Sequence, residues 1–423
     1  GATVVAESSG AGQHAMAATI VDKAIPFLDR LQHPALPARL ADTLLRKCGI
    51  PKFVHLCSVT PPSIMQDLYQ RVDKASASAF AHITGVPRDH PSVFEVEGGA
   101  LVKYQTRGPE LYAKCMLDPR HDAQAVASVS SPRPIFQEAL AASDDDCDTS
   151  ETKAPSEDDT YPPSSSPVAA DHSAAAAHRR SVLGFMANRW IAYGDEQLHC
   201  MSNSEFAYAM QLRCGVLRCS ARFCTCGAAL SQEKPVEGLT HLLSCQHNRY
   251  GFTDRHNLVV GALRNLLQDT YGFDIRLEPT QFPDYGSGEK KRPDFMDRSA
   301  RCVSAVVDFT CVTASCPSYL RMEHPAALMA RRKVEKHAPH VESLPGFRFF
   351  PLVAEAGGNV DGSAEALVRH LANERRISER GRFKGQFYDV LSTNLQKGNA
   401  TILKHAIARV EKAATKATRA SFS

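Results

Sequence analysis

Four residues near the middle of the chain combine zinc-binding side chains with a spacing that suits a metal site. Cys224 and Cys226 are separated by one residue, and His241 and Cys245 follow as a second pair. Structural zinc takes four thiolate or imidazole ligands in a tetrahedron, which a cysteine pair on a turn and a His/Cys pair one helical turn apart can provide. We therefore predict a structural zinc site, with Cys219 as an alternative to one thiol of the first pair. The competing interpretation is a group of buried free thiols beside a surface histidine.

Two aspartates farther along the chain suit a different metal. Asp294 opens a short strand-like segment, and Asp308 lies within the apolar, β-branched run 302–313. A buried, unpaired carboxylate is costly, so Asp308 requires a cation or a hydrogen-bond network. If the two segments pair as strands, both carboxylates reach one end of a sheet and can bind Mg²⁺ or Mn²⁺, which prefer oxygen ligands. Such an ion activates water and stabilises charge on a phosphate. The competing interpretation makes Asp308 a paired structural residue.

Basic residues that can steady a phosphate lie on the predicted helix 326–337. Lys333 and Lys336 are both candidates, and Lys333 shares a helix face with His337 one turn later. For each lysine taken alone, a solvated helix face is the alternative. The spacing does not choose between the two lysines.

The elements that must position these side chains follow from the spacing of apolar residues. In the N-terminal part, apolar residues at helical spacing predict helices over 37–48 and 63–84. A basic helix is predicted over 395–420. Between them, a mixed α/β region is expected in this order: helix 255–269, strands 273–278, 292–296 and 302–313, helix 326–337, strand 347–354 and helix 363–375.

The charge of the chain is unevenly distributed. The whole sequence has a net charge of +3, but segment 141–173 contains nine acidic residues and one lysine, which is a net charge of −8. The remainder therefore carries +11, and a basic surface attracts phosphate backbones. Segment 141–178 is rich in Ser, Pro, Ala and Asp, so it buries too little apolar surface to offset the entropy of ordering. We predict a disordered acidic linker there.

Composition argues against two other classes of protein. No apolar stretch reaches the length of a transmembrane helix, and residues 1–12 lack the basic and apolar regions of a secretory signal. The thirteen cysteines are therefore not expected to form a disulfide framework. We expect an α+β multidomain protein, divided into a helical segment (13–125), the acidic linker (141–178), a zinc-binding module (180–250), an α/β core (251–380) and a basic helical tail (381–423).

The order of these motifs resembles a known group of proteins. Pro293-Asp294, followed by Asp308 on the next buried strand of an α-β-β-β-α-β order, resembles the PD-(D/E)XK nuclease superfamily. The longer order is similar to the C-terminal region of site-specific non-LTR retrotransposon polyproteins, where a zinc knuckle precedes a restriction-like endonuclease. It comprises the Cys/Cys/His/Cys cluster, Arg255-His256-Asn257, Glu278-Pro279, Arg292-Pro293-Asp294, Val307-Asp308, and Lys333 with His337. Segment 13–125 is similar to the thumb and linker that follow the reverse transcriptase palm.

The resemblance implies a PD-(D/E)XK-like α/β nuclease core with a mixed sheet, which nicks target DNA in the nucleus to prime reverse transcription. Its implied cofactors are structural zinc and catalytic magnesium or manganese. Its implied partners are target DNA and the element RNA, with no membrane, in a chain that is part of a longer polymerase-containing polyprotein. The implied site consists of Asp294 and Asp308 on the metal, Lys333 as the catalytic lysine, Glu278 assisting the metal, and Arg255, His256, Asn257, Arg292, Lys336 and His337 on nucleic acid.

Several positions depart from the pattern of this group. Thr310 stands two residues after Asp308, so the D-x-K form is absent, and His337 stands where a tyrosine is common. The H-x₃-C half of the zinc cluster is one residue shorter than in the knuckle, and the chain has no Tyr/Phe-x-Asp-Asp polymerase motif. Two other functions therefore remain: a non-catalytic nucleic-acid-binding remnant of such a polyprotein, and a helical scaffold stapled by zinc. Nicking of DNA in Mg²⁺ or Mn²⁺ distinguishes them from the nuclease.

Overall fold

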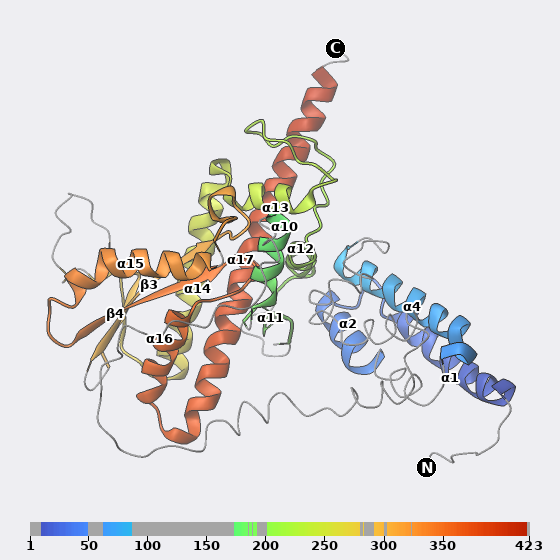
Figure 1. Cartoon of the computed structure of the whole chain (residues 1–423), viewed down its shortest axis with the longest axis horizontal. Coiled ribbons are helices and arrows are strands. Elements are labelled where there is room, and N and C mark those ends of the chain that lie inside the picture. Colours follow the sequence, from blue (N-terminus) through green and yellow to red (C-terminus); the bar gives the residue numbers. More distant parts are fainter. Residues whose placement is uncertain are drawn as a thin grey trace, which may run out of the picture.

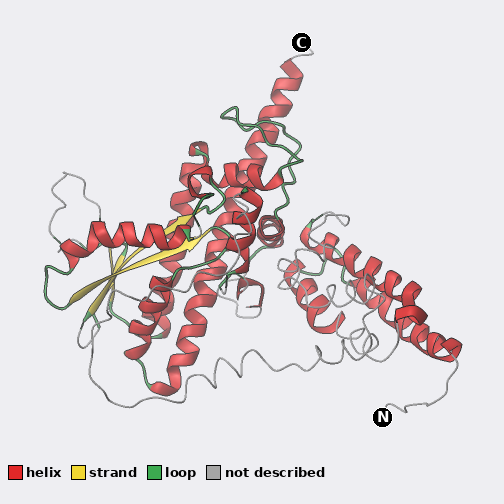
Figure 2. Ribbon diagram, viewed as in Figure 1, coloured by secondary structure: helices red, strands yellow, loops and turns green. Residues whose placement is uncertain are grey.

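The computed structural model describes residues 10–49, 62–86, 173–184, 186–187, 189–192, 201–279, 282, 292–299, 303–322 and 324–420. The predicted linker lies outside these residues up to position 172, as do residues 50–61 and 87–125 of the predicted helical segment. The described residues form a group of N-terminal helices and a larger α/β body (Figure 1). Helices are the main component, and the strands gather in one sheet within the body (Figure 2).

The N-terminal helices pack through the apolar faces that the sequence predicts. They are α1 (Gly10–Arg30), α2 (Ala38–Leu44) with a π-helical turn after it (Leu45–Gly49), and α4 (Pro62–Thr84). Leu68, Val72 and Ile83 of α4 are buried in the core that these helices share. The predicted helices 37–48 and 63–84 are thus confirmed, with shifts of one residue at the ends. The same core takes in apolar side chains from residues 190–216, which joins these helices to the body.

Short helices lead from this core to the Cys/His cluster. They are α10 (Ala174–Leu183), α11 (Arg189–Ala192), α12 (Asn203–Cys214) and α13 (Pro235–Ser244). Ser202 and Glu205 form a capping box at the start of α12, so each satisfies a free backbone N–H group of the first turn. α12 ends at Gly215, whose φ of +67° lies in the region that glycine adopts without steric cost.

The predicted mixed α/β order is confirmed in residues 249–373. It consists of α14 (Arg249–Asn265) with a π-helical turn (Leu266–Thr270), β1 (Ile275–Leu277), β2 (Phe295–Asp297), β3 (Ser304–Val312), α15 (Pro325–Val341), β4 (Phe347–Glu355) and α16 (Gly362–Asn373). The strand order is β1-β2-β3-β4. The first two pairs are antiparallel and β3 pairs parallel with β4, so the sheet is mixed. Strands β3 and β4 are buried along most of their length, as their apolar sequences predict.

The last helix differs most from expectation. α17 (Ile377–Ala420) begins well before the predicted start at 395 and runs through the middle of the body (Figure 1, red). Its buried side chains extend from Phe383 to Val410 and pack against α12, α13, α14 and α16. Gly398 permits the close crossing of α14, because a Cβ atom at this position would lie 2.5 Å from the Cγ of Arg255. Up to Val410, this helix is therefore a central support of the body and not a separate tail.

Candidate functional site

The Cys/His cluster is assembled by a hairpin and the end of a helix. In the hairpin, the N–H of Cys224 donates to the carbonyl of Ala228 (2.8 Å), and Gly227 makes the turn with a φ of +91°. Helix α13 carries His241 in its last turn, and Cys245 follows the end of that helix. The four ligand atoms of Cys224, Cys226, His241 and Cys245 all lie within 4.8 Å of one another. The predicted ligand set is thus brought together in space.

The geometry of the cluster fits a tetrahedral zinc ion. With Zn–S bonds of about 2.3 Å, two sulfur ligands of a tetrahedron lie about 3.8 Å apart. The Sγ atoms of Cys224 and Cys245 are 3.9 Å apart, and the Sγ of Cys226 is 3.2 Å from Nε2 of His241. The amide of Ala228 lowers the pKa of the Cys226 thiol, whereas burial raises the pKa of Cys245 to about 11. Burial also lowers the pKa of His241, which favours the neutral imidazole that binds metals.

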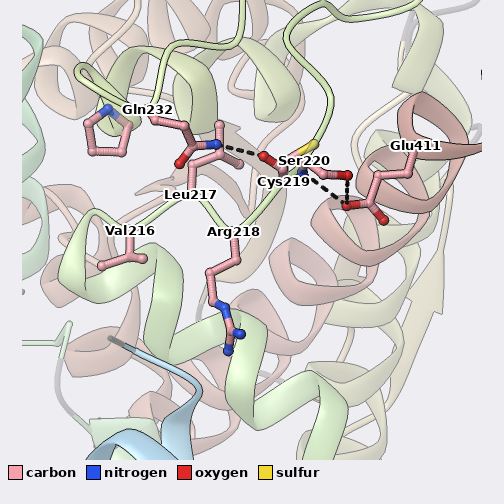
Figure 3. A pocket seen from close by; sticks show the side chains of 8 residues that line it. Val216, Leu217, Arg218, Cys219, Ser220, Gln232 and Glu411 are labelled. Atoms are coloured by element: carbon pink, nitrogen blue, oxygen red, sulfur yellow. Dashed lines mark hydrogen bonds between the residues drawn. The ribbon is translucent and has the colours of Figure 1, made fainter. Parts of the chain in front are cut away.

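Cys219 occupies a different environment from the four clustered residues. It lines a pocket of about 420 Å³ together with Ser220 and Glu411, as Figure 3 shows. Its carbonyl accepts a hydrogen bond of 2.6 Å from Gln232, and its Sγ donates to the carbonyl of Ala221. Burial raises the pKa of the Cys219 thiol, as it does that of Cys245, so position and not acidity separates Cys219 from the cluster. In this structure, Cys226 and not Cys219 completes the group with Cys224.

The two aspartates meet through the pairing of β2 and β3. Phe295 pairs with Val307 in antiparallel register, so the preceding Asp294 lies next to Asp308. The N–H of Asp294 donates to the carbonyl of Val307 (2.9 Å), and its carbonyl accepts from the N–H of Glu278 (2.9 Å). Backbone hydrogen bonds from two strands thus position Asp294, and the middle of the buried strand β3 positions Asp308.

Asp308 lies between two basic side chains of α15. Its Oδ2 atom accepts a hydrogen bond from the ammonium of Lys333 and lies 3.3 Å from Nε2 of His337. His337 is only 3% exposed, and its ring stacks on Phe349 of β4 at 5.2 Å. Burial alone would raise the pKa of Asp308, but the hydrogen bond to His337 and the charge of Lys333 outweigh it and lower that pKa.

Asp294 has its own set of partners. Its Oδ1 atom lies 2.9 Å from Nε2 of His256 on α14, and its Oδ2 atom accepts from the N–H of Phe309 at 2.5 Å. The ring of His256 also packs against the ring of Phe309, with 5.6 Å between centroids. Burial raises the pKa of Asp294, and the negative charge of Asp308 raises it further against the effect of His256. The two neighbouring carboxyls therefore shift in opposite directions.

The structure separates the two candidate lysines. Lys333 contacts Asp308, whereas the side chain of Lys336 is exposed. Glu278 is exposed at the end of β1 with a φ of +42°. Within the described residues, the Cys/His cluster is the single group of three or more metal-ligating side chains, so Glu278 does not form one with the aspartates.

The predicted nucleic-acid contacts divide into exposed and buried residues. Asn257 and Arg292 are exposed, and His256 is half-buried at Asp294. Arg255 is only 6% exposed, and its guanidinium donates to Oδ1 of Asn399 on α17 at 2.8 Å. In this position Arg255 joins two helices, and the buried His337 likewise faces Asp308. Contact of these two residues with nucleic acid stays a prediction.

Two contacts of the site were not predicted from the sequence. The stacking of Phe349 on His337 has a signal in the alternation of Phe347 and Phe349 along β4, which points both residues to one face of the sheet. The pairing of His256 with Asp294 joins residues 38 positions apart, and no local pattern indicates it.

Comparisons with known proteins do not extend this description. No model of a known protein family matches the chain, and no curated protein matches it either. Within the described residues, no helix combines the length and the apolar character that a membrane-spanning segment needs.

Proposed function

We propose that the α/β body is a metal-dependent DNA endonuclease of the PD-(D/E)XK type, belonging to a retroelement. It would nick target DNA in the nucleus and leave a 3′-hydroxyl that primes reverse transcription of the element RNA. The observation that carries the proposal is the meeting of Asp294 and Asp308 from two paired strands beside the ammonium of Lys333. Carboxylates that can hold a divalent cation, with a lysine beside them, are able to support hydrolysis of a phosphodiester.

The donor set suits a hard divalent cation. Asp294 and Asp308 are adjacent carboxylates that share a largely buried position, and oxygen ligands of this kind bind Mg²⁺ or Mn²⁺. Such an ion, when bound, activates water and offsets the charge that develops on the phosphate.

The protein's own side chains prepare this site for a phosphate. His256 and the N–H of Phe309 hold the Asp294 carboxylate in one orientation, and His337 does the same for Asp308. Lys333 lies close enough to reach a phosphate oxygen bound at the aspartates and to offset its negative charge. The excess of +11 outside segment 141–173 would attract the DNA backbone toward this site.

A plasmid-nicking assay tests the proposal. Replacing Asp308→Asn keeps the size of the side chain and removes its charge, so nicking in Mg²⁺ or Mn²⁺ is expected to disappear while DNA binding stays nearly intact. Asp274→Asn is the matched control, because Asp274 is exposed and forms a surface ion pair with Arg298 at 3.8 Å. Unchanged nicking by the Asp308→Asn variant would contradict the assignment.

One observation favours the second candidate, a non-catalytic nucleic-acid-binding protein. Among the described residues, the aspartates do not belong to a group of three or more side chains placed to hold a metal ion, and Lys333 already neutralises Asp308. This candidate keeps the zinc module and the basic surface, and it predicts salt-sensitive binding of DNA or RNA without cleavage in either metal. The parent protein in the nicking assay distinguishes the two functions.

A further inference from the structure

A buried glutamate lies at the end of β4, outside the two sites described above. Glu355 is only 2% exposed. Its carboxyl accepts hydrogen bonds from the side chains of Ser181 and Asn359 and from the backbone N–H of Ala326. Burial raises the pKa of Glu355, and these three donors act against that rise. The hydrogen bonds tie the end of β4 to α10 and to the start of α15.

Helix α15 begins with a backbone donor that its own N-cap side chain does not satisfy. Pro325 is the first residue of the helix and has no N–H group, and the N-cap residue His324 makes no side-chain capping hydrogen bond. The N–H of Ala326, the second residue, has no acceptor within the helix. The Glu355 carboxyl accepts from this N–H, so it caps α15 from the neighbouring strand.

The remaining contact between the start of α15 and the sheet is apolar and involves small side chains. Ala326 and Ala330 pack with Val312 of β3 and Val353 of β4. Apolar contact has no preferred direction, so these methyl groups do little to fix the position of the helix along the strand. A hydrogen bond has a strict distance and angle. Glu355 therefore supplies the fixed point at the start of α15.

The anchored side of α15 is also the side that faces Asp308. Four of its residues recur at spacings of three and four and so lie along one side of the helix: Ala326, Ala330, Lys333 and His337. The last two contact Asp308. A shift of the helix by the rise of one residue, about 1.5 Å, would displace both from that carboxylate.

We propose that Glu355 is a positioning residue of the nicking reaction, which holds α15 in the register that places Lys333 and His337 at Asp308. The inference rests on the proposed function, because the consequence of this placement is catalysis at the aspartates. In the sheet Asp308 pairs with Pro351, four residues before Glu355, which is roughly 13 Å along the strand. Glu355 thus acts through α15 and not on the phosphate itself.

Separate measurements of kcat for nicking and of the affinity for duplex DNA test this role in the full chain. Glu355→Met fills the same space without an acceptor and should lower kcat roughly tenfold, because small displacements at an active site are costly. Its DNA affinity should stay close to that of the parent. Glu355→Gln keeps a carbonyl oxygen for Ala326 and should retain most of kcat. Glu365→Ala is the control, since Glu365 is exposed on α16 and pairs with Arg369 at 2.9 Å.

A second substitution separates positioning from a loss of stability. His324 is exposed at the N-cap of α15, where aspartate is among the best capping residues. His324→Asp added to Glu355→Met should restore most of kcat, because it gives the first turn a new acceptor. It cannot replace the acceptor that Ser181 and Asn359 lose, so the melting temperature should stay below that of the parent. Recovery of kcat without recovery of stability identifies positioning.

Hydrogen exchange of the α15 amides gives a readout that does not depend on cleavage. Exchange over residues 326–337 should be faster in Glu355→Met and return toward the parent rate in the double variant. If the parent protein does not nick DNA, the proposed function fails, whereas exchange still decides whether Glu355 anchors α15.

Three results would overturn the role of Glu355. One is a parent-like kcat in folded Glu355→Met protein, and another is a lowered kcat that His324→Asp does not restore. The third is failure of both the single Glu355→Met and the double variant to fold, which would assign Glu355 to stability alone.

Discussion

Asp294 and Asp308 are adjacent, yet their side chains have unequal surroundings. Two basic groups from α15 stabilise the charged form of Asp308 and lower its pKa, whereas burial and the neighbouring charge raise the pKa of Asp294. Each carboxyl also has a histidine that fixes its orientation, His337 in one case and His256 in the other. This arrangement explains how two carboxyls can lie side by side.

The two lysines of α15 provide a prediction at this scale. Lys333→Ala removes the ammonium at Asp308 and should slow nicking roughly 100-fold, as loss of one electrostatic donor does at other active sites. Lys336→Ala is the matched control, three residues along the same helix, and should leave the rate close to that of the parent. The measurement is the initial nicking rate of both variants at saturating metal. Equal effects of the two substitutions would exclude a special role for Lys333.

At the scale of elements, short strands and one helix create the site. The antiparallel register of β2 and β3 sets the two aspartates side by side, and α15 lies against β4 and β3. Because Lys333 and His337 are one helical turn apart, both reach the same carboxylate. In the same way, the hairpin positions Cys224 and Cys226, and α13 positions His241 and Cys245.

Replacing one of the predicted zinc ligands tests the Cys/His cluster. Cys245→Ser should abolish stoichiometric zinc and lower the melting temperature by roughly 10 °C, equivalent to about 3 kcal/mol, because a structural metal contributes folding free energy. Cys219→Ser is the control, since Cys219 lies at the neighbouring pocket and outside the cluster. Metal analysis and thermal unfolding check both variants. Full zinc content in the Cys245→Ser protein would exclude that residue as a ligand.

A buried histidine of α10, His178, packs against α12 and gives a pH prediction. Burial lowers the pKa of His178 to about 4, and its Nε2 atom makes no hydrogen bond with the described residues. In the unfolded chain His178 binds a proton near pH 6.5, whereas in the folded chain it does so only near pH 4. The free energy of unfolding therefore falls as the pH drops through this window. The full loss is about 3 kcal/mol.

Denaturant unfolding between these pH values measures the effect. His178→Phe should flatten the decline in the free energy of unfolding, whereas His405→Ala, at an exposed position of α17, should leave it unchanged. An equally steep decline in the His178→Phe protein would show that other groups cause it.

At the scale of the whole molecule, α17 connects the parts. It contacts α12 and α13 near the zinc module and α14 and α16 of the α/β body. The N-terminal helices are attached by specific contacts, such as the hydrogen bond of 2.7 Å from Arg218 to the carbonyl of Gly85. The charge distribution adds a second, long-range property, since an acidic segment offsets most of the positive charge of the remainder.

Removal of that segment should strengthen binding to DNA. A chain without residues 141–172 loses a net charge of −8 and carries +11 instead of +3. Its affinity for duplex DNA should rise roughly tenfold at low salt, and the gain should vanish at high salt because exposed charges are screened. A chain with a scrambled segment of the same composition should behave like the parent. A gain that persists at high salt would contradict an electrostatic cause.

The sequence by itself determined the order of helices and strands in the α/β body, the candidate Cys/His ligands apart from the choice between Cys219 and the first cysteine pair, and the shared face of Lys333 and His337. Each depends on residues close in the chain, where helical or strand spacing decides which side chains lie together. Only the tertiary structure decided that Arg255 is buried against Asn399, 144 residues away, that His256 pairs with Asp294, and that α17 supports the body. These features arise where distant segments pack, and burial there depends on which faces meet rather than on any local pattern.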